Sequence, residues 1–236
     1  MKKIFIFMSL TLILLLVLGL LNQQGILISP WEDKDKALLK ALKKNQLHQF
    51  EKLLKNGANP NAIYGINPSE WVMCEANKKD NIDFLKLAIK YGGDINLRNT
   101  TPPITKSLDS IWSAPILCAI TMHNYRAFEF LLKNNANIDI KVRPDAKKIA
   151  EDNKHARPEA LGKTMYSSPL IQAIYSNEYK MAYDILQNIE KLSPEEEWKI
   201  PISITGGIAP ISEANQWRLK VVDLLRKRGY EINLKE

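Results

Sequence analysis

The chain has 236 residues, of which 45% are hydrophobic and 25% charged, and its formal net charge is +7. Apart from its N-terminus, this is the composition of an ordinary globular protein. Two cysteines are too few for a disulfide framework, which excludes the small secreted scaffolds that depend on one.

The first predicted element is the predominantly apolar run Ile4–Leu21, which Lys2 and Lys3 precede. Its 18 residues are longer than the core of most signal peptides and lie at the short end of what spans a bilayer. No small-residue cleavage site follows it, and the two lysines favour a cytoplasmic N-terminus. We therefore expect residues 1–22 to be an uncleaved signal anchor that spans the inner membrane through residues 4–21. A cleaved signal peptide, which would leave a soluble periplasmic protein, is the alternative.

Both interpretations place the chain from Asn22 onward in the periplasm, which argues against nucleic acid as a partner. The exported part keeps a formal charge of +5 once Lys2 and Lys3 are set aside. This excess suits an acidic protein partner or an anionic membrane surface, and it is equally compatible with simple solubility.

After a linker at residues 23–35, five similar segments follow one another. Each predicts a short helix, a tight turn, a second helix that holds a Leu-Leu-like pair, and a loop that opens on Gly or Asn. The second helices end at Gly or Asn, and two inter-helix turns also hold Asn, because these residues tolerate the left-handed backbone that a helix end needs. The segments are 36–62, 71–97, 114–140, 168–190 and 208–234. The residues expected at positive φ are Gly57, Gly92, Asn135, Gly229, Asn45 and Asn177.

These segments resemble the ankyrin repeat. Pro115 and the sequence Ser168-Pro169-Leu170 match the Thr-Pro-Leu start of that repeat, and a small alanine follows in each first helix. The alanines are Ala41, Ala76, Ala119, Ala173 and Ala214. The resemblance implies an all-α fold: an ankyrin-repeat solenoid of about five helix-turn-helix units over residues 36–236, next to the N-terminal hydrophobic helix. Repeat steps longer than 33 residues predict loops inserted at about 98–113, 141–167 and 191–207.

The sequence offers little that could carry chemistry. None of His48, His123 and His155 has a partner at metal-ligand spacing, and no catalytic motif occurs. We expect no enzyme activity, no cofactor and no metal. We expect Cys74 and Cys118 to be two buried thiols, because packed helices lie about 8–10 Å apart and a disulfide needs Cα atoms within about 7 Å. An oxidising compartment keeps the bond possible.

The resemblance places partner contacts at the hairpin tips and in the last turn of each first helix. Two lysine pairs would form a basic end, Met122 and Tyr175 an amphipathic middle, and Trp112 an aromatic anchor, with Trp71 and Tyr166 as further anchors. Packing of these aromatic residues beneath the inserted loops is an equal alternative. The predicted partner-binding residues are Lys43, Lys44, Lys78, Lys79, Trp112, Met122 and Tyr175.

An exported ankyrin array in one compact domain resembles the bacterial immunity proteins that are paired with lipase effectors of type VI secretion systems. The resemblance implies a non-catalytic periplasmic module that binds a secreted toxin through an acidic patch and occludes its active site. The alternative is a membrane-tethered scaffold that docks an envelope protein of its own cell.

Overall fold

The computed structural model describes residues 33–65, 70–77, 82–98, 114–140, 168–204 and 213–234. This part of the chain contains ten α-helices, and its only β contact is an isolated antiparallel bridge between Ile63 and Trp71. The predicted all-α class is therefore confirmed for it. The helices are α2 (Lys34–Lys43), α3 (Leu47–Lys55), α4 (Val72–Asn77), α5 (Asp83–Lys90), α6 (Pro115–Thr121), α7 (Tyr125–Lys133), α10 (Pro169–Tyr175), α11 (Tyr179–Gln187), α12 (Pro194–Ile204) and α13 (Glu213–Lys227).

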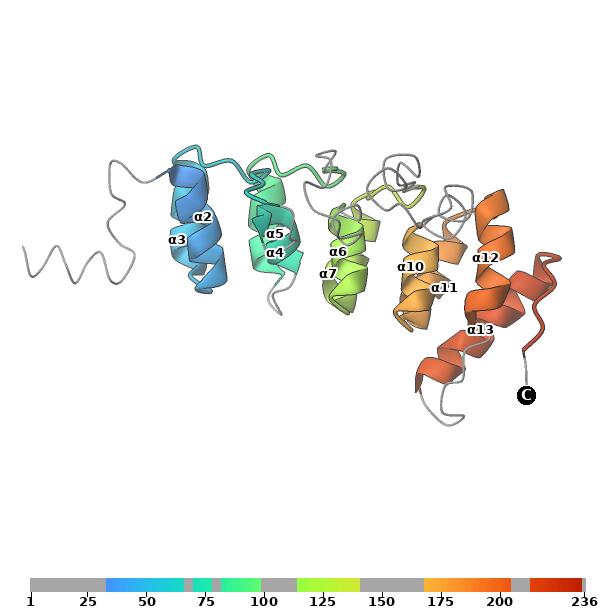
Figure 1. The fold of residues 1–236 in the computed structure, drawn as a ribbon. Coiled ribbons are helices and arrows are strands. Elements are labelled where there is room, and N and C mark those ends of the chain that lie inside the picture. Colours follow the sequence, from blue (N-terminus) through green and yellow to red (C-terminus); the bar gives the residue numbers. More distant parts are fainter. Residues whose placement is uncertain are drawn as a thin grey trace, which may run out of the picture.

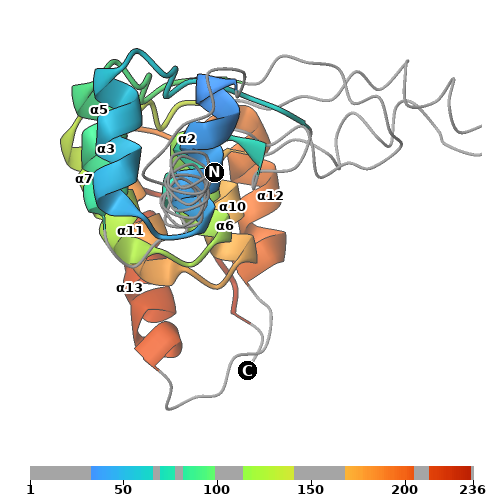
Figure 2. The same cartoon turned by 90° about the vertical axis from the view of Figure 1, so that its left-hand side faces the viewer.

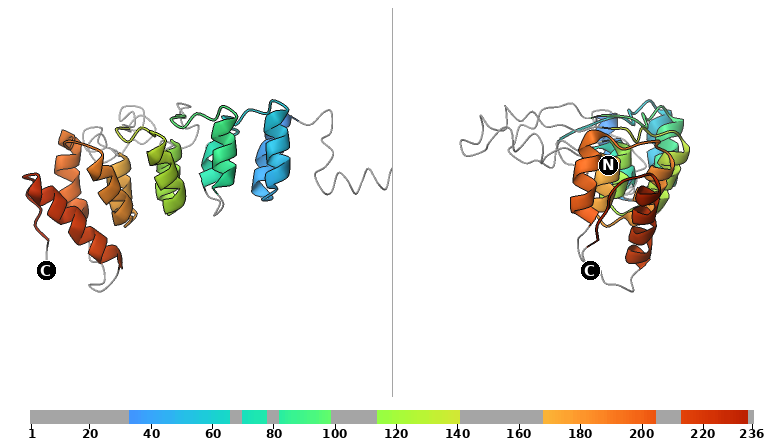
Figure 3. Two further views of the ribbon diagram at one scale, coloured as in Figure 1. Left: turned by 180° about the vertical axis from the view of Figure 1, so that it is seen from behind. Right: turned by 90° about the vertical axis from the view of Figure 1, so that its right-hand side faces the viewer.

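The helices from α2 to α11 form four successive antiparallel pairs that stand side by side in one row (Figure 1). α12 and α13, which we call the fifth pair, continue the row at its C-terminal end, where α12 packs on α10 and the obliquely placed α13 packs on α11. The first helix of each pair packs against the first helix of the next, from α2 through α4, α6 and α10 to α12. Seen along the row, the first helices make one layer and the second helices make the other (Figure 2). Figure 3 shows the row from behind and, in its right-hand view from the C-terminal end, the same two layers. Each pair therefore buries its apolar face against its neighbours.

The first four pairs follow the predicted segments, with α2 beginning two residues before the predicted domain start. The fifth pair does not. Segment 208–234 was expected to hold two short helices, but α13 runs as one helix of 15 residues, and the first helix of this pair is α12. Residues 216–221 contain no Gly, Asn or Pro that would favour a turn, so the helix continues through them. Ala214 is consequently a first-turn residue of α13.

Helix α12 lies within the predicted inserted loop 191–207, and a capping box explains why it forms there. Ser193 precedes α12, and its backbone N–H donates to Glu196 Oε2 at 2.8 Å while the Glu196 N–H donates to Ser193 Oγ at 3.4 Å. Pro194 occupies the first helical position, where its missing N–H costs nothing. Ser168, the cap of α10, donates to the buried carboxylate of Glu196 at 2.5 Å. The starts of α10 and α12 are thus joined.

One continuous core runs through the row. The alanines of the first four first helices are at most 2% exposed, which lets these helices approach closely. Each second helix turns its leucine-like pair or an equivalent apolar residue toward them. The alanines are Ala41, Ala76, Ala119 and Ala173, and the largest fully buried second-helix residues include Phe50, Phe84, Phe128 and Tyr179.

The predicted left-handed positions are confirmed. Gly57, Gly92 and Gly229 have φ between 82° and 93°, and Asn135 has a φ of 62°. In the inter-helix turns, Asn45 and Asn177 both have φ of 59°. His123 occupies the same slot in the third pair with a φ of 55°, a conformation that costs a histidine more than an asparagine.

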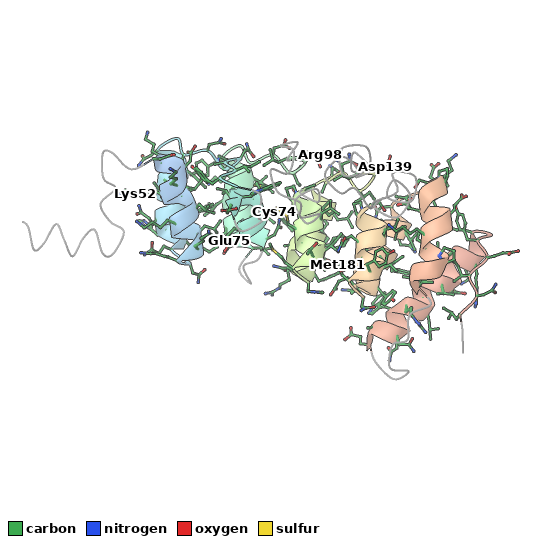
Figure 4. All side chains as sticks on the ribbon, in the orientation of Figure 1. Lys52, Cys74, Glu75, Arg98, Asp139 and Met181 are labelled. Carbon is green, nitrogen blue, oxygen red and sulfur yellow. A yellow bond between two sulfur atoms is a disulfide. The ribbon has the colours of Figure 1, made fainter. Side chains whose placement is uncertain are left out.

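A ladder of Asn and Asp side chains joins the pairs along the edge where one pair connects to the next. Asn61 accepts a hydrogen bond from the backbone N–H of Asp94 at 2.7 Å and donates to the carbonyl of Gly92 at 2.9 Å. One pair further on, Asn96 accepts from the N–H of Asn137 at 2.7 Å. Figure 4 places Arg98 and Asp139 along this upper edge. The members of the ladder are Asp33, Asp35, Asn59, Asn61, Asp94, Asn96, Asn137 and Asp139.

Replacing Asn61 by alanine should lower the free energy of unfolding by about 1–3 kcal/mol, because two hydrogen bonds between the first and second pairs are lost. Asn134→Ala is the matched control, since its side chain donates only within its own helix, to Phe130 O at 2.7 Å. We expect a change of at most about 0.5 kcal/mol there. Chemical denaturation of both variants measures the difference. Equal losses would mean that the ladder adds nothing to the coupling between pairs.

Candidate interaction edge

The turns that join the two helices of the first, third and fourth pairs lie along the edge opposite the ladder, which we call the turn edge (Figure 1). Lys43 is the last residue of α2 and Lys44 is its C-cap, and both side chains are exposed. A lysine at a helix C-terminus also interacts favourably with the helix dipole. These two predicted residues therefore lie where the sequence placed them, on the surface at the N-terminal end of the turn edge.

Met122 and Tyr175 occupy equivalent ends of neighbouring first helices. Met122 is the C-cap of α6 and is half-buried, whereas Tyr175 ends α10 and is 53% exposed. The amine of Lys199 lies 5.4 Å from the centroid of the Tyr175 ring. Lys199 itself is only 7% exposed, and this burial lowers its pKa. The structure thus brings Met122 and Tyr175 to one edge and adds a buried cation beside the exposed ring.

The turns of the third and fourth pairs are tied together by a contact that the sequence analysis did not find. His123 Nδ1 lies 2.7 Å from Glu178 Oε1, and the histidine side chain is 62% exposed. Asn124 caps α7 and donates to the carbonyl of Asn77 at 2.6 Å, which joins the third turn to the end of α4. These bonds hold the middle of the turn edge in one geometry. The sequence contained one signal for this contact: His123 stands in the turn position that Asn45 and Asn177 occupy in the first and fourth pairs.

Several predicted contact residues cannot be placed on this edge. Lys78, Lys79 and Trp112 lie outside the described residues, as does Tyr166. Trp71 is described and is 0% exposed, with its indole N–H donating to the carbonyl of Gly65 at 2.8 Å. Trp71 as a binding anchor is therefore wrong. It packs in the interior with Ile63, Cys74 and Cys118, whereas the loop inserted after its segment lies almost wholly outside the described residues.

Cys74 and Cys118 form a disulfide, which corrects the expectation of two free thiols. Their Cα atoms are 5.5 Å apart, and Trp71 and Ile63 pack around the sulfur atoms (Figure 4 labels Cys74). The expectation compared the wrong distances. Helix axes lie about 8–10 Å apart, but each Cα stands about 2.3 Å from its axis, so facing Cα atoms can approach to about 3.4–5.4 Å, which a disulfide can bridge. The bond joins α4 to α6 and so fixes the second pair to the third.

A shallow groove of about 460 Å³ lies on the layer of second helices, between α3 and α5. Its carboxylates already have partners, since Glu51 meets Lys55 at 3.0 Å and Asp83 meets Lys86 at 3.2 Å. The hydrogen bond from Lys55 lowers the pKa of Glu51. Such paired surface charges are typical of a solvated helix face and do not form a reactive arrangement.

Within the six described ranges, no cluster of three or more His, Cys, Asp or Glu side chains is placed to hold a metal ion. None of the helices there is long and apolar enough to cross a bilayer, and the predicted anchor at residues 4–21 lies outside these ranges. Searches against protein-family models and curated proteins found no match to this chain.

Proposed function

We propose that this chain is a non-catalytic protein-binding module of the ankyrin type that works outside the cytoplasm. Stacked helix pairs with left-handed Gly and Asn residues at matching positions support the ankyrin assignment. Arrays of this kind present an extended surface to a partner rather than a reactive centre. Following the resemblance of the whole architecture, the module is an immunity protein that binds a secreted antibacterial effector of lipase type and occludes it.

The turn edge carries this proposal. It presents two exposed lysines, Lys43 and Lys44, in the first pair and the exposed ring of Tyr175 in the fourth pair. The His123–Glu178 and Asn124–Asn77 contacts fix its turns before any partner arrives. A preorganised edge loses little conformational entropy on binding, and tyrosine is among the residues enriched at interface hot spots.

The disulfide supports the proposed compartment. Disulfides persist in oxidising environments such as the bacterial periplasm and are rare where thioredoxin and glutathione keep thiols reduced. Cys74 and Cys118 lie in the interior of the row and are at most 4% exposed, so their bond has a structural position rather than that of a reactive surface thiol.

The test measures binding of the full chain to a purified secreted hydrolase of the lipase-effector type. Lys43→Glu combined with Lys44→Glu should slow association, most strongly at low salt, because steering of an acidic patch is screened over about 8–10 Å at physiological ionic strength. Met122→Ala combined with Tyr175→Ala should instead speed dissociation, because these side chains would be desolvated contacts. Stopped-flow or surface-based kinetics at two salt concentrations measures both rate constants.

Lys52→Glu combined with Lys55→Glu is the matched control, since it makes the same charge change on α3 of the same pair. Rates that respond equally to both lysine sets would reduce the effect to net charge. Unchanged rates in every variant would place the interface elsewhere. Loss of inhibition of the hydrolase should accompany loss of binding. Binding only to an envelope protein of the same cell would favour the scaffold instead.

A further inference from the structure

The layer of second helices carries an ordered cluster of aromatic rings and amines near its C-terminal end, on α7, α11 and α13. The amine of Lys180 lies 3.3 Å from the centroid of the Tyr125 ring and 5.9 Å from that of Trp217. Lys220 lies 3.9 Å from the Trp217 ring, and Tyr183 packs against that ring at 5.6 Å. We call Tyr125, Lys180, Tyr183, Trp217 and Lys220 the aromatic–lysine patch. Lys220 is exposed and the other four residues are half-buried.

Three carboxylates of the same three helices already have partners. Asp184 accepts a hydrogen bond from the Tyr125 hydroxyl at 2.7 Å. Glu129 pairs with Lys133 at 3.0 Å, and Asp223 pairs with Lys227 at 2.8 Å. Burial and the bond to Asp184 raise the pKa of Tyr125, so its hydroxyl remains a donor at neutral pH.

Lys180 and Lys220 differ from Lys133 and Lys227 in having rings rather than carboxylates as neighbours. In the described part of the chain, no carboxylate lies within ion-pair distance of either amine. A ring attracts a cation but does not neutralise it. The patch therefore holds two positioned positive charges that still lack an anion.

We propose that the aromatic–lysine patch binds an acidic segment of a partner protein. Two fixed ammonium groups complement two carboxylates, and the half-buried rings between them offer contact to an apolar side chain of the same segment. Neighbouring helix axes lie about 8–10 Å apart, so a surface across three helices matches about six residues of extended chain. A free anion would engage the amines but would leave the rings unused.

This patch belongs to the layer of second helices, whereas the turn edge is formed by the turns at one end of the pairs (Figures 1 and 2). The inference goes beyond the proposed function, because it gives the chain a second surface that operates whether or not the turn edge captures an effector.

The experiment uses the full chain in zwitterionic detergent, labelled with 5-fluorotryptophan, and a short synthetic peptide that alternates glutamate and leucine. Trp217→Phe assigns the fluorine resonance of Trp217. Titration with the peptide should move this resonance in a saturable way. Lys180→Gln combined with Lys220→Gln should weaken binding about tenfold or more, since each pair of opposite charges contributes to the same site. Lys133→Gln combined with Lys227→Gln removes the same charge from the same layer and should leave the affinity unchanged.

Circular dichroism verifies that each variant is folded, and the exposed Lys220→Gln alone repeats the test if the double variant is not. Equal weakening by the control pair, or an unmoved Trp217 resonance, would overturn the proposal. A resonance that moves with phosphatidylglycerol vesicles or inorganic phosphate but not with the peptide would also overturn it. Lys43→Glu combined with Lys44→Glu should not alter peptide binding, which separates this result from any failure at the turn edge.

Discussion

Ala173→Asp should lower the free energy of unfolding by about 3–5 kcal/mol, a large part of the total stability of a domain. Ala173 is 0% exposed in the middle of α10, where this helix packs between α6 and α12. A carboxylate there loses its hydration and gains no partner. Lowering the pH should reduce the difference from the wild-type chain, because the protonated carboxyl group is less costly to bury. Urea denaturation at two pH values measures both effects.

Gln172→Glu is the control for Ala173→Asp. It introduces the same charge into the same helix, at a half-buried neighbouring position. We expect a change of at most about 1 kcal/mol, because the only side-chain interaction that is lost among the described residues is the hydrogen bond from the Gln172 amide to Ser176 Oγ at 3.1 Å. An unchanged melting temperature in Ala173→Asp would show that the fourth pair does not use the close helix contact of an ankyrin unit.

Removing the disulfide should have a comparably large effect. Cys74 and Cys118 are separated by 44 residues, and closing a loop of this length in the unfolded chain corresponds to about 4 kcal/mol in the chain-entropy model. Cys74→Ala combined with Cys118→Ala should therefore lower the free energy of unfolding by about that amount, plus a smaller loss of buried contacts around Trp71.

Reductant provides the internal comparison. The free energy of unfolding of the wild-type chain should fall toward that of the double variant when dithiothreitol is present, and the double variant should not respond. Titration of thiols in the denatured chain should find none before reduction. Two titratable thiols in protein purified without reductant would contradict the bond and would restore the interpretation that the sequence favoured.

The positions of the helices and turns were largely predictable because local chemistry specifies them. Pro115 and Ser168-Pro169 mark helix starts, and Gly57, Asn45 and Asn177 supply the left-handed residues that end helices. The fifth pair was missed although Ser193-Pro194 repeats the start signal of the fourth. The apolar spacing of residues 208–225 imitates that of two short helices, but no residue that favours a turn separates them.

The contacts between pairs were harder to predict because they depend on how one helix faces the next. His123 and Glu178 are 55 residues apart, as are Tyr125 and Lys180. This separation is close to the 54-residue step from Ala119 to Ala173, so the periodicity contains the information that these positions are neighbours. It does not contain the side-chain rotamers that turn a lysine toward a ring or a histidine toward a carboxylate.

In a linear row whose pairs pack mainly against their neighbours, the stability of each pair depends on the interfaces with the pairs on either side. Opening a terminal pair breaks one interface, whereas opening an internal pair breaks two, so thermal fluctuations fray the row from its ends. The covalent bond between α4 and α6 lies inside the row, and it keeps the second and third pairs aligned while the outer pairs open and close by local unfolding. The second and third pairs therefore keep their native surfaces exposed to the ends of the row. The terminal helices, α2 and α13, can refold onto the neighbouring pairs without unfolding of the whole domain.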